Sequence, residues 1–126
     1  MENLILTCLR FHKKLMKKCY ILWNRYYLKL LIGKDNLGSF SYIHNKVYFR
    51  IASGSLIRIG DHFTFTSGEN YNPLCRNIRG GIVAERKSSK IIIGNYVGIS
   101  SACIWAKDEI KIGNYVNIGG NCIIMD

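Results

Sequence analysis

The side chains that could carry acid–base or metal chemistry are few and widely spaced in this chain. Its three histidines are His12, His44 and His62, and histidine is the residue type that titrates nearest neutral pH. The five cysteines are an odd number and include no Cys-x-x-Cys pair, so neither a zinc knuckle nor a disulfide scaffold is expected. We predict no metal site. Because these side chains are far apart in the sequence, the fold would have to bring them together to form any other site.

The composition is that of a folded domain with an uneven distribution of charge. Of the 126 residues, 48% are apolar and 21% are charged, and the formal net charge is +10. Residues 1–34 carry +7 of that charge, so the remainder is close to an ordinary surface. Basic residues interrupt the N-terminal apolar positions, which is unlike a secretory signal. We therefore predict a cytoplasmic protein, peripheral at the inner face of the membrane if residues 1–34 bind lipid, with no nucleic-acid partner.

Residues 1–34 form a basic leader whose residues 3–32 have the pattern of an amphipathic helix. The segment lacks proline and has no glycine before Gly33, and its Leu, Lys, Met and Arg residues favour helix. Leu15, Cys19, Leu22 and Tyr26 fall on one helical face. Two interpretations stay open. The helix binds an anionic membrane surface, or it packs on the following domain or on a neighbouring subunit.

Residues 35–126 contain short apolar segments with an internal repeat. Residues 91–105 align with residues 110–124 at a spacing of 19, and a fainter copy begins at Ile57. Large apolar residues recur every six positions, and smaller residues follow four positions later. The large set is Ile93, Ile99, Trp105, Ile112, Ile118 and Ile124, and the small set is Val97, Cys103, Val116 and Cys122. We predict that both sets face the core of a β-solenoid with three strands per coil, with one extra residue inserted within 106–109.

The corners and the interruption of this repeat also lead to predictions. Gly and Asn follow the inward isoleucine, and we expect the corner there to need backbone angles that a Cβ resists. Residues 67–90 carry no clean repeat and include Pro73, the only proline. This stretch is either a loop that leaves the coils to form part of a substrate pocket, or an imperfect coil.

The motif Ile-Gly-Asn-Tyr-Val-x-Ile occurs at 93–99 and again at 112–118. It resembles the hexapeptide repeat of acyltransferases, and is most similar to the sugar and polysaccharide O-acetyltransferases related to maltose and galactoside acetyltransferases. The resemblance covers about residues 36–126 and implies an all-β fold, a left-handed parallel β-helix, of which this chain would be the N-terminal part. It further implies acetyl-CoA as co-substrate, a sugar or glycan hydroxyl as acceptor, and a homotrimer with active sites between neighbouring subunits.

The same resemblance implies that a histidine acts as general base without a covalent enzyme intermediate. That histidine would follow Asp126, so the 126-residue chain alone is expected to be inactive, and none of the three histidines present matches its position. Asp126 would be a supporting acid, or simply a corner residue. Candidate substrate-binding residues are Asn72, Ser100, Ser101 and Trp105, and Lys107 is a candidate for binding the CoA, although surface or packing roles stay open for all of them. The alternative function is a non-catalytic, membrane-associated scaffold or binding module.

Overall fold

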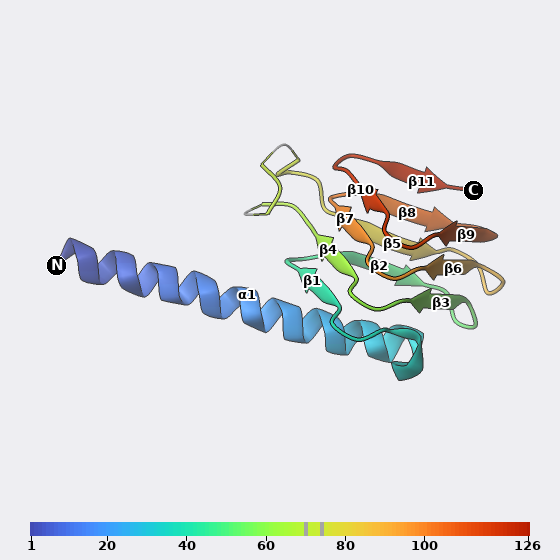
Figure 1. The fold of residues 1–126 in the computed structure, drawn as a ribbon, viewed down its shortest axis with the longest axis horizontal. Helices are drawn as coiled ribbons and strands as arrows, with labels where there is room; N and C mark the ends of the chain where they lie inside the picture. Colours follow the sequence, from blue (N-terminus) through green and yellow to red (C-terminus); the bar gives the residue numbers. More distant parts are fainter. Residues whose placement is uncertain (70, 74) are drawn as a thin grey trace.

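The computed structural model describes residues 1–69, 71–73 and 75–126, which form one long helix followed by short strands (Figure 1). The helix α1 spans Glu2–Ile32, and the 3₁₀ turn η1 spans Lys34–Asn36. The strands are β1 (Tyr42–His44), β2 (Tyr48–Ile51), β3 (Leu56–Ile59), β4 (Thr64–Thr66), β5 (Gly81–Ala84), β6 (Lys90–Ile93), β7 (Gly98–Ser100), β8 (Cys103–Ala106), β9 (Glu109–Ile112), β10 (Asn117–Ile118) and β11 (Ile123–Met125). Gly33 ends the helix at a φ of 91°, as the sequence predicts.

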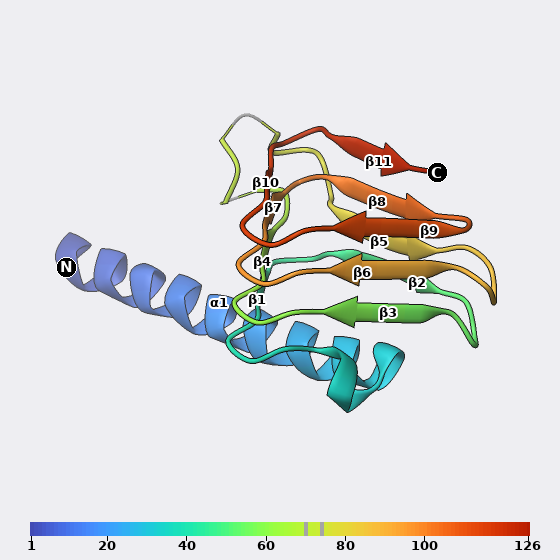
Figure 2. The same ribbon diagram turned by 45° about the vertical axis from the view of Figure 1, so that its right-hand side comes forward.

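The strands form three parallel sheets, and the chain visits these sheets in rotation. The first sheet has the order β1-β4-β7-β10, the second β2-β5-β8-β11, and the third β3-β6-β9. Figure 2 shows the strands of successive turns lying one above another. We call the connections from the first to the second sheet the first corner, those from the second to the third the second corner, and those from the third to the first the third corner.

The pairing in two of the sheets confirms the repeat alignment. In the third sheet Ile91 pairs with Ile110 and Ile93 with Ile112, and in the first sheet Ile99 pairs with Ile118. These isoleucines are buried, and the faint earlier copy is real because Ile57 pairs with Ile91. Like residues therefore stack on like in successive turns, at the spacing of 19 that the sequence predicts for residues 91–118.

The prediction for Cys103 and Cys122 is wrong, because the two repeat copies differ in length at the first corner. Cys103 pairs with Ile123, a spacing of 20 rather than 19. Three residues (100–102) separate the paired Ile99 and Cys103, whereas four (119–122) separate their partners Ile118 and Ile123. The additional residue shifts Cys122 onto an exposed corner, so the two cysteines are not stacked core residues.

The same shift corrects the orientation expected for Trp105. Ile104 is fully buried, so the alternation along β8 turns Trp105 to the outer face. Trp105 pairs with Met125, and Ile104 pairs with Ile124, which packs against the core as predicted. The extra residue predicted within 106–109 is not found there: only two residues (107–108) separate Ala106 from Glu109, whereas five (85–89) separate their partners Ala84 and Lys90.

The C-terminal half of α1 closes one end of the hydrophobic core. Leu28 is fully buried in the same cluster as Ile43 and the inward residues of the sheets. The buried Asn24 amide donates hydrogen bonds to the carbonyls of Ile43 (3.0 Å) and Asn45 (2.6 Å), which fixes the helix on β1. The helix thus covers apolar surface that the first turn of strands would otherwise expose to water.

The residue type that adopts the left-handed backbone at the third corner differs from the prediction. The left-handed position in four successive turns is occupied by Phe40, His62, Tyr96 and Tyr115, with φ between 54° and 57°, and not by glycine. Their rings stack in sequence with centroids 4.9, 4.5 and 5.0 Å apart. The aromatic side chains form an exposed column along the outside of the corner, and stacking offsets part of the conformational cost.

The outer faces of the three sheets have different chemistry. The first sheet presents mainly hydroxyl and amide groups, which include Thr64, Thr66, Ser100 and Asn117. The second presents apolar side chains on its last strands, namely Cys103, Trp105, Ile123 and Met125. The third presents mainly charged groups, among them Arg58, Lys90, Glu109 and Lys111, the last two joined by a 3.0 Å ion pair.

Candidate functional site

A polar cluster lies where the loop 67–80 crosses the first corner. The loop is shorter than the predicted 67–90 because Gly81–Ala84 form β5. The Asn72 amide donates to Ser101 Oγ at 2.6 Å, and Thr66 Oγ1 lies 3.2 Å from both Asn72 Oδ1 and Ser100 Oγ. Three of the predicted substrate-binding residues, Asn72, Ser100 and Ser101, are therefore brought together.

Two cavities open on either side of this cluster. The cavity beside Ser100 has a volume of about 250 Å³ and is lined by Asn72, Pro73, Cys75, Ser100, Gly119 and Gly120. The cavity beside Tyr71 measures about 480 Å³ and is lined by Glu69, Tyr71, Asn72, Pro73 and Arg76. Asn72 and Pro73 form the wall between the two cavities. A concave surface of this size with hydroxyl and amide groups fits a small polar ligand such as a sugar ring.

Buried hydrogen bonds hold the two ends of the loop together. Ser67 is fully buried, and its hydroxyl accepts the backbone N–H of Gly80 at 2.9 Å and donates to the carbonyl of Lys46 at 2.7 Å. A Cβ on Gly80 would lie 2.5 Å from Cε2 of the buried Phe65. The loop therefore leaves and rejoins the strands at a fixed point, and its position over the first corner is set by packing as well as by hydrogen bonds.

An aromatic and basic group borders the cavity beside Tyr71. The rings of His44 and Tyr71 are 5.0 Å apart, and Lys17 Nζ lies 4.9 Å from the centre of the Tyr71 ring. Burial lowers the pKa of His44, and the positive charge of Lys17 lowers it further. Burial also raises the pKa of Tyr71. His44 is thus biased to its neutral form, in which one ring nitrogen can accept a proton or hydrogen bond.

The other predicted site residues lie at the opposite end of the second sheet. Trp105 Nε1 donates to Glu85 Oε2 at 2.6 Å, on the outer face of that sheet. Lys107 lies at the second corner, where its backbone N–H donates to Asp126 Oδ1 at 2.6 Å and that of Asp108 donates to Oδ2 at 2.8 Å. The bond from Lys107, first among several backbone bonds, lowers the pKa of Asp126. This carboxylate already serves as a cap for the corner.

Within one chain, the structure therefore divides the predicted residues into two groups. The loop cluster contains Asn72, Ser100 and Ser101, whereas Trp105, Lys107 and Asp126 belong to the second corner; the two corners stand at opposite ends of the strands in Figures 1 and 2. Sequence reasoning missed Thr66, Tyr71 and Cys75. Thr66 could have been found from its position six residues after Gly60, next to the faint repeat copy, but the contributions of Tyr71 and Cys75 depend on how the loop folds.

Comparison with known proteins finds no counterpart for this chain: no family model, no curated protein and no solved structure matches it. Among the residues that the structure describes, no three His, Cys, Asp or Glu side chains are grouped so that they could hold a metal ion.

Proposed function

We propose that this chain is part of an acetyl-CoA-dependent O-acetyltransferase of the hexapeptide-repeat family that acts on a sugar or glycan hydroxyl. The proposal includes a left-handed β-helix for residues 35–126 and a cytoplasmic setting, where acetyl-CoA is available. Its main support is the cavity that the loop 67–80 forms over the first corner, where the amide of Asn72 and the hydroxyl of Ser100 lie in an otherwise apolar wall. The rotation of the chain through three parallel sheets is the arrangement that the family resemblance implies.

The reaction would transfer the acetyl group directly to the acceptor. The base removes the proton of the acceptor hydroxyl, the oxygen attacks the thioester carbonyl, and CoA leaves as the thiol once its sulfur is protonated. The resemblance assigns the base to a position after Asp126, so the proposal assigns only binding roles to the described residues. Asn72 and Ser100 would bind acceptor hydroxyls, because each offers hydrogen-bonding groups at the cavity.

The separation of the two residue groups favours a site completed by a second copy of the chain. The loop cluster and the group of Trp105 and Lys107 lie at opposite ends of the second sheet, and the outer face between them is apolar. Ile123 and Met125 on that face are 69% and 58% exposed. In a homotrimer that buries this face, the loop cluster of one subunit would approach the second corner of its neighbour.

Binding measurements test this function without depending on the base. Calorimetric titration of the chain with CoA, and then with a panel of neutral sugars, is expected to give saturable binding of both. Asn72→Ala should weaken sugar binding by roughly tenfold, the effect of losing a hydrogen bond to a ligand, and leave CoA binding unchanged. Tyr115→Ala changes an exposed residue of the third corner and is the matched control. If the chain did not bind CoA, either alone or in the presence of any of the sugars, the enzyme proposal would be refuted.

The second candidate function is a non-catalytic, membrane-associated binding module. The observation that favours it is the large exposed surface of α1 beyond the strands (Figure 1). A chain that binds lipid but neither CoA nor sugars would have this function and not the transferase function.

A further inference from the structure

One face of α1 is apolar apart from His12 and is exposed along the helix. Two adjacent rows of side chains recur at helical spacing on this face. The rows are Leu4, Cys8, Leu15, Cys19, Leu22, Tyr26 and Leu30, and Ile5, Leu9, Met16 and Trp23. Leu22 is 70% exposed and Trp23 is 62% exposed, although both lie in the half of the helix that reaches the strands. An apolar face of this length is unusual on the surface of a protein that has no partner.

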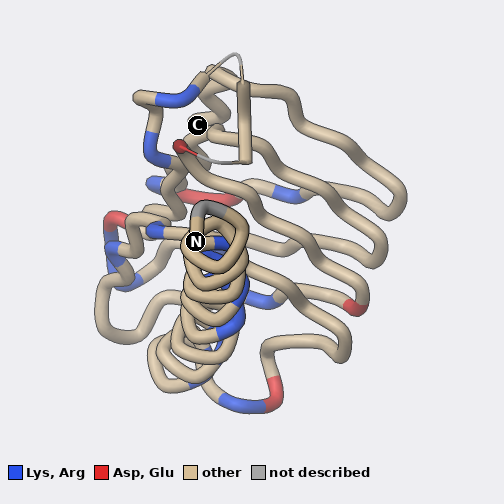
Figure 3. The backbone as a smooth tube through the Cα atoms, turned by 90° about the vertical axis from the view of Figure 1, so that its left-hand side faces the viewer, with Lys and Arg blue, Asp and Glu red and all other residues tan. Residues whose placement is uncertain are grey.

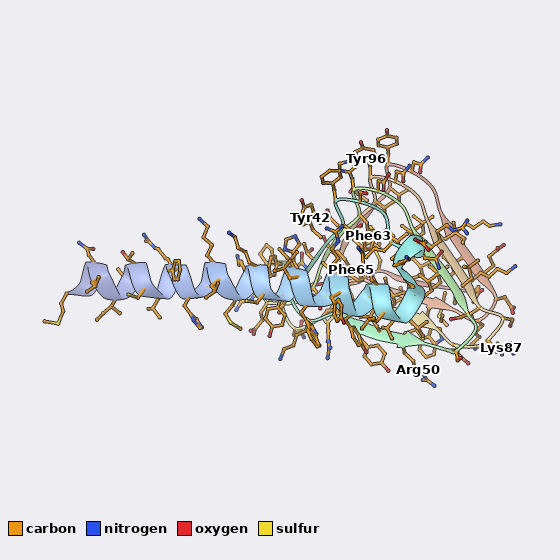
Figure 4. All side chains as sticks on the ribbon, turned by 90° about the horizontal axis from the view of Figure 1, so that it is seen from below. Tyr42, Arg50, Phe63, Phe65, Lys87 and Tyr96 are labelled. Carbon is orange, nitrogen blue, oxygen red and sulfur yellow. The ribbon has the colours of Figure 1, made fainter. Side chains whose placement is uncertain are left out.

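This face points away from the sheets. The helix contacts the strands through Asn24, Leu28 and Tyr27, whose ring lies 6.1 Å from that of Phe49. Asn24 lies two positions, or about 200°, around the helix from Leu22. Viewed from below in Figure 4, α1 lies in front of the strands, and none of the described segments covers it. The N-terminal half extends past the strands in Figures 1 and 4, and all of residues 3–19 are exposed. The sheets therefore leave the apolar face free along the full helix.

The rest of the helix surface is basic. Arg10, Lys13, Lys14, Lys17, Lys18, Arg25 and Lys29 are distributed around the remaining circumference, and residues 3–34 contain no Asp or Glu (Figure 3). A helix with Trp, Tyr and Leu on one side and Lys and Arg on the other has the composition of helices that lie in the plane of a membrane interface. The charge is complementary to anionic headgroups, which attract each basic residue near the surface.

We propose that α1 binds flat on an anionic lipid bilayer, with its apolar face among the acyl chains and the sheets held on the water side. A second copy of α1 is a poorer occupant of this face, because it would bring seven more positive charges against the seven already present. Trp23 and Tyr26 would lie at the level of the headgroups, where amphipathic aromatic rings are favoured.

No helix within the described residues has both the length and the apolar content needed to cross a membrane.

Vesicle flotation tests the proposal with defined lipids. The chain is mixed with phosphatidylcholine vesicles, or with vesicles in which about one lipid in three is phosphatidylglycerol, at low and at high salt. Binding is expected to the anionic vesicles only, and to weaken with salt. Replacing Leu4, Leu15 and Leu22 together by Gln should weaken binding by more than about a hundredfold, because each buried Leu contributes roughly tenfold. Lys14→Gln with Lys18→Gln should weaken it by roughly tenfold or more.

Two controls keep the experiment decisive. The triple change Tyr42→Gln, Tyr48→Gln and Tyr115→Gln removes exposed rings of the strands and should leave vesicle binding unchanged. Circular dichroism checks the helix content of each variant, and the Lys14 and Lys18 variant tests the idea even if the Leu variant loses helix. Equal binding of the native chain and the Leu variant, or equal binding to neutral and anionic vesicles, would overturn the proposal. It would also be overturned if the native chain ignored vesicles and formed a multimer that the Leu variant does not form.

Discussion

At the third corner, three residue types serve three separate structural needs. Glycine permits close stacking, because a Cβ on Gly94 would lie 2.8 Å from the backbone nitrogen of Asn114. Asparagine supplies the acceptor between turns, since Asn114 Oδ1 accepts the backbone N–H of Asn95 at 2.8 Å. The aromatic residue adopts the left-handed backbone, as Tyr96 does. The repeated Gly-Asn-Tyr is therefore explained by contacts between turns, which a single coil considered alone does not reveal.

The inward position of the repeat can be tested on two adjacent residues of β6. Ile93 is buried and Ile92 lies on the outer face. We expect Ile93→Ala to lower the free energy of unfolding by about 2–5 kcal/mol, because it leaves a cavity in the core. Ile92→Ala should cost no more than about 1 kcal/mol. Urea denaturation of both variants is the measurement, and equal losses would mean that the strand is assigned to the wrong register.

The environment of His44 predicts a dependence of stability on pH. Its pKa in the folded protein lies below the ordinary value of 6.5, because burial and the charge of Lys17 favour the neutral ring. The unfolded chain therefore binds the proton more readily than the folded chain does. The stability linked to His44 is fully present above pH 6.5 and is lost as the pH falls from there through the lowered pKa.

Melting temperatures measured from about pH 8 to about pH 5 would detect this effect. The native chain should lose more stability on acidification than His44→Gln, which has no titrating ring at this position. If the melting temperatures of the two proteins changed equally across that pH range, the prediction would be contradicted. An NMR titration of His44 with a midpoint at or above 6.5 would also contradict it.

At the level of elements, the sequence predicts the strands well where contacts between turns repeat. The helix end at Gly33, the inward isoleucines and the spacing of 19 through Ile118 all follow from periodicity and turn chemistry. The outer position of Trp105 does not, because it depends on a corner that is one residue shorter than its counterpart. The number of residues in a corner does not affect the alternation of buried and exposed residues within the strands on either side. A single sequence therefore does not reveal which corner holds the additional residue.

The candidate site was less predictable than the strands for a related reason. Asn72, Ser100 and Ser101 were candidates from the sequence, and the structure brings them together. Their hydrogen bonds depend on the path of the loop 67–80, which has no repeat to fix it. Asp126 was expected beside a catalytic base, yet its carboxylate accepts the backbone N–H groups of Lys107 and Asp108. Such a cap is recognisable only when the neighbouring turn is in place.

The fixed exit point of the loop gives a prediction for Gly80. A Cβ at this position would collide with the buried ring of Phe65, at 2.5 Å from Cε2 and 2.7 Å from Cζ. Gly80→Ala should therefore destabilise the chain by about 1–3 kcal/mol. Gly113→Ala is the matched control because a Cβ there meets no atom within 4 Å, and it should cost less than about 0.5 kcal/mol. If thermal denaturation showed equal stability for both variants, the packing of the loop exit on Phe65 would be refuted.

On the scale of the whole molecule, the three outer faces point to three different surroundings. The charged face of the third sheet suits water, whereas the polar face of the first sheet borders the loop cluster. The second sheet ends in exposed apolar side chains on β11, and α1 presents its own apolar face beneath the strands. The proposed trimer would cover the second sheet, and the proposed membrane contact would cover the helix, so the two proposals concern separate surfaces.

The trimer proposal can be tested by placing a charge on the outer face of the second sheet and, as a control, on the outer face of the third sheet. Ile123 on the second sheet is 69% exposed in the single chain and would be buried between subunits. Ile123→Asp should therefore convert a trimer to a monomer, because an unpaired carboxylate would be buried at the interface. Ile92→Asp places the same charge on the third sheet, where Ile92 pairs with Arg58 and Lys111, and should leave the trimer intact. Light scattering after size exclusion, in buffer without lipid, gives the masses. A native chain that is monomeric at high concentration, or two variants that respond alike, would show that the second sheet is not the subunit interface.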